Sequence, residues 1–216
     1  MKLKWNGHAC FTVTSDSGVI IIIDPYEPGG FAGALRYAPV PDKADLVLIT
    51  HEHSDHNFVK GLKGSPKLVR ESGELRGIKI KALPAFHDDR QGAERGKNLL
   101  FSFLVDGIRV AHLGDLGHML DQQQVDQLEH PDVLLIPVGG TFTIDADHAF
   151  RLTNMIKPKI AVPMHFKTEK VDFPIKPAEK FSELFTKVKK LEQSEVEISK
   201  SGLPPTTEVW VLKYAC

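Results

Sequence analysis

Residues 50–57 read THEHSDHN and place three histidines and one aspartate within six consecutive positions. The whole chain has only ten histidines in 216 residues, so an ordinary polar surface loop is a poor explanation for this cluster. Neutral imidazole is the commonest metal ligand in proteins, and carboxylate binds many of the same ions. The stretch therefore predicts a metal site.

The residues before the cluster, ADLVLIT at 44–50, have the pattern of a buried strand, which favours a strand-to-helix loop for the cluster itself. His51 and His53 are two positions apart in an extended segment, so their side chains point the same way and can share one ion. Asp55 and His56 are adjacent at the turn and point elsewhere, so they can bind a second ion.

The remaining ligands must come from distant parts of the chain, because the cluster alone leaves each ion under-coordinated. Three apolar runs end directly at a ligand-type residue: IKALPAFH at His87, IRVAHLGD at Asp115 and KIAVPMH at His165. Gly114 and Gly117 stand on either side of the aspartate and allow the backbone to approach closely. We therefore expect these three side chains to complete the site.

Composition predicts a soluble globular protein with one domain over residues 1–216. Apolar residues make up 42% and charged residues 25%, and the net charge of −1 gives no footprint for nucleic acid. The two cysteines, Cys10 and Cys216, stand at opposite ends of the chain and predict free thiols in a reducing compartment. The N-terminus lacks a signal-peptide pattern, and the longest apolar run, at 19–23, is too short to span a bilayer. We expect a cytoplasmic protein without membrane contacts.

Hydrophobic patterning predicts strands first and interleaved helices later, a layered α/β (α+β) architecture. The predicted strands are 2–6, 9–15, 19–24, 46–50, 67–70, 78–83, 99–105, 108–112, 133–136, 160–163, 195–198 and 207–213. The predicted helices are 121–129, 146–156 and 178–191, the last from an apolar stripe at helical spacing.

These motifs, taken in order, resemble the metallo-β-lactamase superfamily. HEHSDH is followed by His87, by Asp115 in GDLG and by His165 in PMHF, and Asp24 in IIIIDP matches an earlier marker. WNGHACF at 5–11 and the run from LLIPVGG to PMHFKT are similar to a branch of small metal-dependent hydrolases related to ascorbate-6-phosphate lactonases. Leu116 departs from the pattern, because many members have threonine after the bridging aspartate.

The resemblance implies a four-layer αββα sandwich with a two-metal site along its edge. His51, His53 and His87 would bind one ion, and Asp115 would bridge it to the other. The implied ligands of that second ion are Asp55, His56 and His165. Two dications about 3.5–4 Å apart need a shared anion, which a carboxylate and a hydroxide supply, and water bound to them has its pKa lowered toward about 7. Asp55 and Asp115 are therefore expected to be catalytic. The ions are two divalent metals, with zinc favoured and manganese or iron as alternatives.

Other side chains are candidates for orienting ligands or contacting substrate. Asp24 is expected to orient a ligand from behind. His8 is either a substrate or supporting contact or a structural turn residue, and His148 is either functional or a plain surface residue. The loop 88–98 is a solvated hairpin loop or a lid whose Arg90 and Arg95 contact substrate. Further cations near the site (Arg36, Lys97 and Lys167) favour a small anionic substrate, and the loop 26–42 is a second wall that also offers Phe31 and Tyr37.

Three functions remain open. The favoured one is a hydrolase in which a metal-bridging hydroxide attacks a small ester, lactone or phosphodiester. The second is a nuclease or phosphodiesterase acting on nucleic acid, which the neutral charge disfavours. The third is a di-iron redox protein or a non-catalytic metal-binding protein. A small-molecule partner is expected, and a homo-oligomer is left open.

Overall fold

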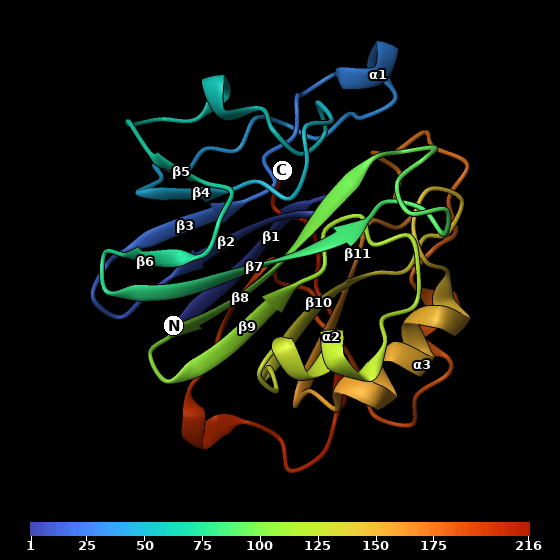
Figure 1. Cartoon of the computed structure of the whole chain (residues 1–216). Coiled ribbons are helices and arrows are strands. Elements are labelled where there is room, and N and C mark those ends of the chain that lie inside the picture. The colour runs from blue at the N-terminus through green and yellow to red at the C-terminus, as the bar shows by residue number, and fades with distance from the viewer.

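Two β-sheets pack face to face in the computed structural model, which describes residues 1–216 (Figure 1). The first sheet has six strands in the order β13-β1-β2-β3-β4-β5. Their bounds are β1 Lys2–Gly7, β2 Cys10–Thr14, β3 Ile20–Ile23, β4 Leu46–Leu48, β5 Lys67–Val69 and β13 Glu195–Glu197. Strands β3, β4 and β5 are parallel, and the other pairings are antiparallel.

The second sheet has eight strands in the order β12-β14-β11-β10-β9-β8-β7-β6. Their bounds are β6 Gly73–Leu75, β7 Ile78–Phe86, β8 Lys97–Val105, β9 Ile108–His112, β10 Val133–Pro137, β11 Ile160–Met164, β12 Val188–Lys190 and β14 Glu208–Val211. Strands β9, β10, β11, β14 and β12 pair in parallel, whereas β6 to β9 form an antiparallel meander. Strands β10 and β11 are buried at every position, as parallel strands covered on both faces must be.

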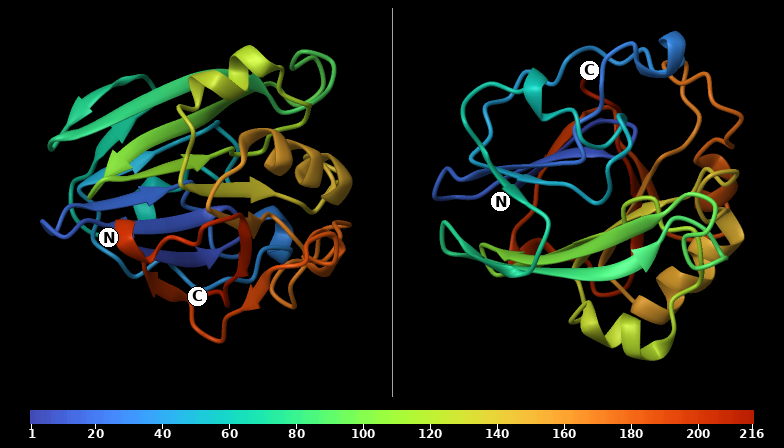
Figure 2. Two further views of the ribbon diagram at one scale, coloured as in Figure 1. Left: turned by 90° about the horizontal axis from the view of Figure 1, so that it is seen from below. Right: turned by 45° about the horizontal axis from the view of Figure 1, so that its top comes forward.

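Helices and loops cover the outer faces of the two sheets unequally (Figure 2). Helices α2 (Gln122–Gln127) and α3 (Ala146–Ile156) lie on the outer face of the eight-stranded sheet. The main core of 46 buried residues includes side chains of both sheets and of these helices. A second cluster of 11, including Ile22 and Tyr37, covers the outer face of the six-stranded sheet, where long loops take the place of a helical layer.

The short elements complete the chain. Helix α4 is the single turn Glu179–Ser182, and 3₁₀ turns occupy Val59–Gly61 and Lys200–Gly202. The element α1, Gly30–Gly33, is not a regular helix, because Phe31 and Ala32 both have left-handed backbone angles. No helix has the length and apolar character needed to cross a membrane.

All the predicted strands are present to within three residues, and the two-sheet sandwich of the αββα fold is confirmed, with loops covering one outer face. The predicted helix 178–191 is wrong. Only its first turn, α4, is helical, and Val188–Lys190 instead forms the edge strand β12 beside β14. Phe181 and Phe185 still pack against each other, with ring centroids 4.9 Å apart. Of the apolar stripe only Phe181 is fully buried and Leu184 is exposed, and pairing with the open edge of β14 overrides the local helical periodicity. The helix expected after residue 57 is also absent, since only the 3₁₀ turn follows.

Candidate metal centre

The predicted ligands all follow strands that run in one direction. Strands β3 and β4 in the first sheet and β9 and β11 in the second precede Asp24, the HEHSDH cluster, Asp115 and His165. Strand β7 is separated from β9 by two antiparallel pairings, so it has the same direction and brings His87 to the same edge. Loops at the carboxyl ends of such strands are where functional groups are positioned by a rigid scaffold.

His51, His53 and His87 form one group, with ligand-type atoms all within 4.8 Å of one another. His51 Nε2 lies 3.0 Å from His53 Nδ1, as expected for two side chains that point the same way. His53 is exposed, whereas the other two are buried. Thr50 Oγ1 lies 3.0 Å from His51 Nδ1 and fixes that ring from behind.

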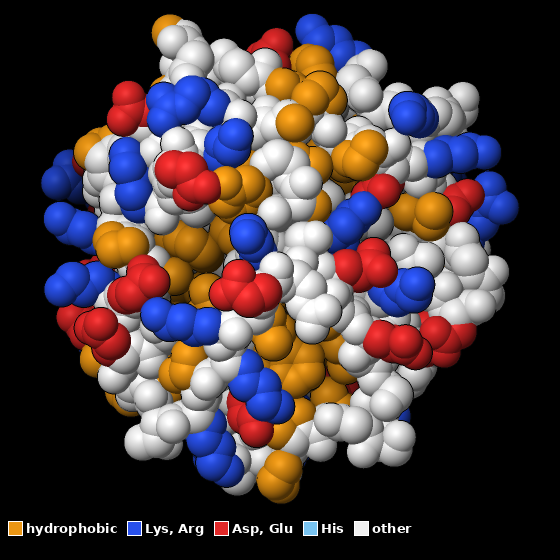
Figure 3. All heavy atoms as spheres, turned by 180° about the vertical axis from the view of Figure 1, so that it is seen from behind, with side chains coloured by type: hydrophobic (Ala, Val, Ile, Leu, Met, Phe, Trp, Pro, Cys, Tyr) orange, Lys and Arg blue, Asp and Glu red, His pale blue; other side chains and the backbone are white.

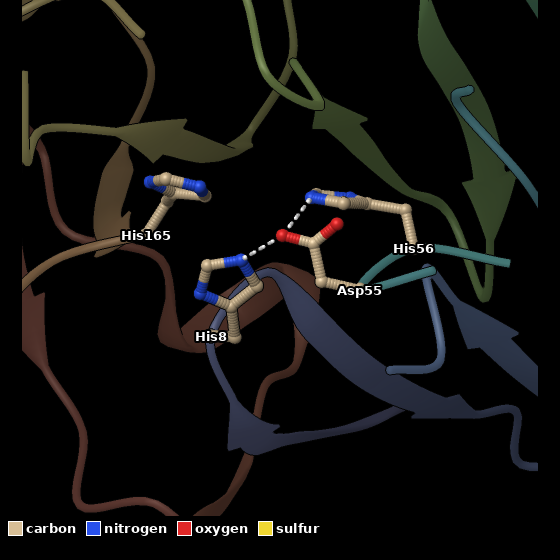
Figure 4. Close-up of side chains that lie close together, drawn as sticks. All are labelled: His8, Asp55, His56 and His165. Carbon is tan, nitrogen blue, oxygen red and sulfur yellow. Dashed lines mark hydrogen bonds and ion pairs between the residues drawn. The ribbon is translucent and has the colours of Figure 1, made fainter. Parts of the chain in front are cut away.

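Asp55, His56 and His165 form a second group with His8, and all four are buried (Figure 4). His8 Nε2 is 3.1 Å from Asp55 Oδ2, and the His8 and His165 rings have centroids 4.2 Å apart. His8 comes from the turn between β1 and β2. The position of His8 beside Asp55 favours a role in supporting that ligand over the alternative of a purely structural residue in a turn.

Asp115 lies between the two groups. Its Oδ2 is 3.2 Å from Nε2 of His87 in one group and 3.2 Å from Nε2 of both His56 and His165 in the other. One carboxylate oxygen thus contacts both groups, which is the position a bridging ligand requires.

Asp24 supports the centre from below. Its Oδ2 accepts hydrogen bonds from His56 Nδ1 at 2.8 Å and from Thr50 Oγ1 at 2.6 Å, and its Oδ1 accepts one from the Thr50 backbone N–H at 2.8 Å. Through Thr50 it also reaches His51. A carboxylate behind a histidine fixes the ring orientation and raises its basicity. The geometry matches the orienting role expected for this residue.

Backbone strain is concentrated at the same edge. His8, Asp24 and His165 have φ values of 52°, 48° and 50°, in the left-handed region that costs non-glycine residues about 1–2 kcal/mol each. Gly114 has φ 54°, and a Cβ there would lie 2.8 Å from Thr50 Cβ. A Cβ on Gly117 would lie 2.3 Å from the His87 carbonyl carbon. Both glycines therefore allow the close backbone approach predicted for them.

Burial keeps several of the imidazoles neutral. It lowers the pKa of His8 to about 4 and that of His51 to about 3, and it also lowers the pKa of His53. Burial opposes protonation of His56 as well, but the carboxylates of Asp115, Asp55 and Asp24 raise its pKa. The neutral rings offer the lone pairs that a cation needs.

The buried polar atoms of the centre are short of partners. Seven buried side-chain nitrogen or oxygen atoms in the chain have no hydrogen bond, and all but Asn6 Oδ1 belong to the centre: His8 Nδ1, Asp55 Oδ1, His56 Nε2, His87 Nδ1, Asp115 Oδ1 and His165 Nδ1. Unpaired buried polar atoms are costly, and cations bound among them would compensate for that cost. The donor set of imidazole and carboxylate fits zinc, manganese or iron.

Leu116 is fully buried in the main core. Its side chain cannot donate the hydrogen bond that threonine would supply at this position. The bridging position of Asp115 is reached without that bond.

The loop 88–98 is organised by Asp88, which is buried at its base. The Asp88 carboxylate accepts backbone hydrogen bonds from four residues of the loop, namely Arg90, Gly92, Glu94 and Arg95. Burial works against the charged carboxylate, but these four N–H groups lower its pKa to about 2. Sequence reasoning missed this role, although an aspartate at the start of a glycine-bearing loop is a signal for such turns.

A cavity of about 240 Å³ opens beside the centre. It is lined by His53, Asp55, His87, Asp115 and His165 together with Arg95, Phe31, Phe142 and Phe173. Phe142 and Phe173 were not predicted, because they stand in loops without a recognisable motif. Both arginines pair with Glu94, but Arg95 lines the cavity and is 34% exposed, whereas Arg90 is 71% exposed and does not line it.

The other candidates lie away from this cavity. His148 is 46% exposed, pairs with Asp145 and lines a separate hollow with His118, which accepts a hydrogen bond from the Phe86 N–H. Arg36 donates a hydrogen bond to the Glu169 carbonyl, and Tyr37 is a buried core residue. Lys97 is exposed, and Lys167 pairs with Asp172. Cys10 and Cys216 are free thiols, as predicted.

Comparison with known proteins agrees with this geometry. The family model described as the β-lactamase superfamily domain matches residues 2–165, which carry every predicted ligand. The chain belongs to this superfamily. A metal-dependent hydrolase of the UPF0173 family from Archaeoglobus fulgidus is 33% identical over 92% of this chain and 94% of that protein. The UPF0173 hydrolase of Thermoplasma acidophilum is 31% identical over 78% and 84%.

Solved structures in the superfamily share the fold. The crystal structure of a candidate Zn-dependent hydrolase from Thermotoga maritima is 34% identical, has a TM-score of 0.81 and covers 99% of both chains. A metallo hydrolase from Ignicoccus hospitalis is 25% identical with a TM-score of 0.61, covering 98% of this chain and 94% of that one. The chain is thus a member of the metallo-β-lactamase superfamily that is similar to metal-dependent hydrolases along most of its length.

Proposed function

We propose that this chain is a dinuclear metal-dependent hydrolase of a small ester, lactone or phosphodiester. One ion would be held by His51, His53 and His87, and the other by the second histidine–aspartate group, with Asp115 between them. The observation that carries the proposal is the position of Asp115 Oδ2, 3.2 Å from histidine nitrogens of both groups. The name of the Thermotoga maritima relative supports zinc as the metal.

The chain's own residues would prepare the site for hydrolysis. Bound divalent ions would supply Lewis acidity and lower the pKa of water, giving a nucleophile near neutral pH. Asp55 borders the cavity, and its Oδ1 has no partner within the chain, while His8 holds its Oδ2. Asp55 is therefore positioned to accept a proton from the attacking water. Phe31 and the other cavity rings would limit the access of bulk water.

A side-chain nucleophile is not part of this proposal. Cys10 is a fully buried member of the second core cluster, and burial raises the pKa of its thiol well above the ordinary value. A buried protonated thiol is a poor nucleophile.

We also propose a reducing, cytoplasmic location, which the two free thiols support.

A nucleic-acid substrate finds less support. The net charge is −1, and basic and acidic side chains intermingle on the one face shown in Figure 3, which does not display the metal centre. The cavity beside the centre contains a single arginine and no lysine. A small molecule therefore fits this site better than a polynucleotide.

The test combines metal analysis with a substrate panel. Protein purified without added metal would be analysed for its ions and assayed on a lactone, a thioester and a phosphodiester. We expect a chelator to abolish hydrolysis and added zinc to restore it, whereas an alkylating agent should leave the activity intact. Hydrolysis that survives complete metal removal, or a covalent substrate adduct on any side chain, would overturn the proposal.

A further inference from the structure

Three phenylalanine rings form one wall of the cavity beside the metal centre. Phe31 comes from α1, Phe142 from the loop after β10, and Phe173 from the loop after β11. The Phe173 ring has its centroid 5.4 Å from that of Phe31 and 5.9 Å from that of Phe142, and it lies 5.9 Å from the His8 ring. We name this set the aromatic wall. Phe31 is half exposed, so the wall extends from the centre to solvent.

Hydrogen bonds between the three loops hold the aromatic wall in place. The 30–36 loop is joined to the 168–176 loop, which is in turn joined to the 139–143 loop. The bonds are Asp172 N–H to Ala34 O at 2.7 Å, Arg36 N–H to Lys170 O at 2.7 Å, Lys176 N–H to Gly139 O at 2.8 Å and Thr141 Oγ1–H to Pro174 O at 2.6 Å. The ammonium of Lys167 also donates to the Phe173 carbonyl at 3.0 Å. Rings fixed in this way need little ordering when a ligand binds.

Polar partners for a substrate are scarce on this side of the cavity. Apart from the ligand-type histidines and aspartates, Arg95 is the only polar side chain that lines it. The Arg95 guanidinium carbon lies 5.9 Å from the Phe142 ring centroid. A substrate with many hydroxyl groups would leave them unpaired against phenyl rings, which is unfavourable. An apolar group would bury surface against the same rings at no such cost.

We propose that the aromatic wall binds an apolar aryl or alkyl group next to the scissile bond of the substrate. The substrate class is thus an aryl- or alkyl-substituted ester, lactone or phosphodiester with at most one anionic or acceptor group, which Arg95 contacts. This inference rests on the proposed hydrolase function and narrows it. The aromatic wall disfavours a phosphorylated sugar lactone. Such a lactone is a strongly polar example of the small anionic substrates that the basic residues of the loops suggested.

A binding experiment tests this independently of turnover. Zinc-loaded protein would be titrated calorimetrically with 4-phenylbutanoate, butanoate and gluconate, which share a carboxylate and differ in the attached group. We expect 4-phenylbutanoate to bind at least about tenfold more tightly than the other two, as a well-filled apolar pocket provides. Phe173→Ala should remove about tenfold of that preference and Phe31→Ala somewhat less, while Leu104→Ala, an exposed control on β8, should have no effect.

Hydrolysis of γ-phenyl-γ-butyrolactone and unsubstituted γ-butyrolactone separates the two proposals. Preferential binding of 4-phenylbutanoate without metal-dependent hydrolysis of either lactone would support the aromatic wall and count against a lactonase function. Metal-dependent hydrolysis with equal binding of the three carboxylates would overturn the aromatic wall alone. Tighter binding of gluconate than of 4-phenylbutanoate would also overturn it. Phe31 is half exposed, so Phe31→Ala is the variant least disruptive to folding. If this variant loses as much butanoate binding as 4-phenylbutanoate binding, the aromatic wall does not select the phenyl group.

Discussion

The two ligand groups of the centre differ in what stands behind them. His53 is exposed, and behind its group Thr50 contacts His51 directly, while Asp24 reaches His51 only through Thr50. The His56 group is buried, His56 contacts the Asp24 carboxylate directly, and Asp55 contacts His8. Supporting contacts of this kind change metal affinity by about 10–100-fold. Ligands of the same chemical type therefore need not bind equally, and the buried group is expected to hold its ion more tightly.

The largest effect is expected from removing the contact between the groups. Asp115→Ala deletes the carboxylate that both groups share, so bound zinc should fall from about two ions per chain and hydrolysis should fall at least about 100-fold. Metal content by mass spectrometry and steady-state kinetics measure these changes. Asp172→Ala, 70% exposed, is the control. Retention of both ions with native affinity would show that the bridging role is wrong.

The next prediction separates the groups. Asp24→Asn keeps the size and tolerates the left-handed backbone, but weakens the contact with His56, so zinc affinity of the buried group should fall about 10–100-fold. Thr50→Val removes the direct contact with His51 and one hydrogen bond to Asp24, so it should weaken the group of His51 more than the group of His56. Calorimetric titration of metal-free protein should resolve the two binding steps. If both variants weaken the same step equally, the two groups do not differ as described.

A smaller effect is expected from the arginine that lines the cavity. Arg95→Gln should raise KM for an anionic aryl ester by roughly tenfold, because an exposed charge contact has modest strength, and should leave a neutral aryl ester within about twofold. Arg90→Gln is the matched control in the same loop, since both arginines pair with Glu94 but Arg90 is 71% exposed and does not line the cavity. An equal response of both substrates to Arg95→Gln would mean that the guanidinium does not select charge.

The smallest effect is expected in the loop that carries this arginine. The pKa of Asp88 is lowered from 3.8 to about 2, so its stabilising contribution is present above pH 3.8 and is lost as the pH falls through about 2. The loop should therefore stay ordered from pH 8 down to about pH 4. Asp88→Asn should speed hydrogen exchange of the amides of residues 90–95 at pH 7, with little change in metal binding. Unchanged exchange would contradict the organising role of this carboxylate.

The positions of the three distant ligands at strand ends could be predicted from the sequence, because each of them ends an apolar run. His87, Asp115 and His165 are far apart in the chain, yet a shared strand direction brings them to one edge. The resemblance then implied how they divide between two ions. Asp24 and His8 lie where an orienting or supporting residue was expected.

Features that depend on pairing between distant segments could not be predicted. The stripe at 178–191 is compatible with a helix, and only the open edge of β14 makes Val188–Lys190 a strand. Phe142 and Phe173 carry no motif, and hydrogen bonds between separate loops place their rings together. Arg90 and Arg95 are equivalent in the sequence, and both backbone N–H groups donate to Asp88, yet only Arg95 lines the cavity.

If two metal ions bind with Asp115 between them, anomalous diffraction at the zinc edge from crystals of the zinc-loaded protein will locate both ions. We predict two anomalous peaks, one at His51, His53 and His87 and one at the buried group that contains His56, with the Asp115 carboxylate contacting both. A single peak, or peaks that leave Asp115 without a metal contact, would contradict this account.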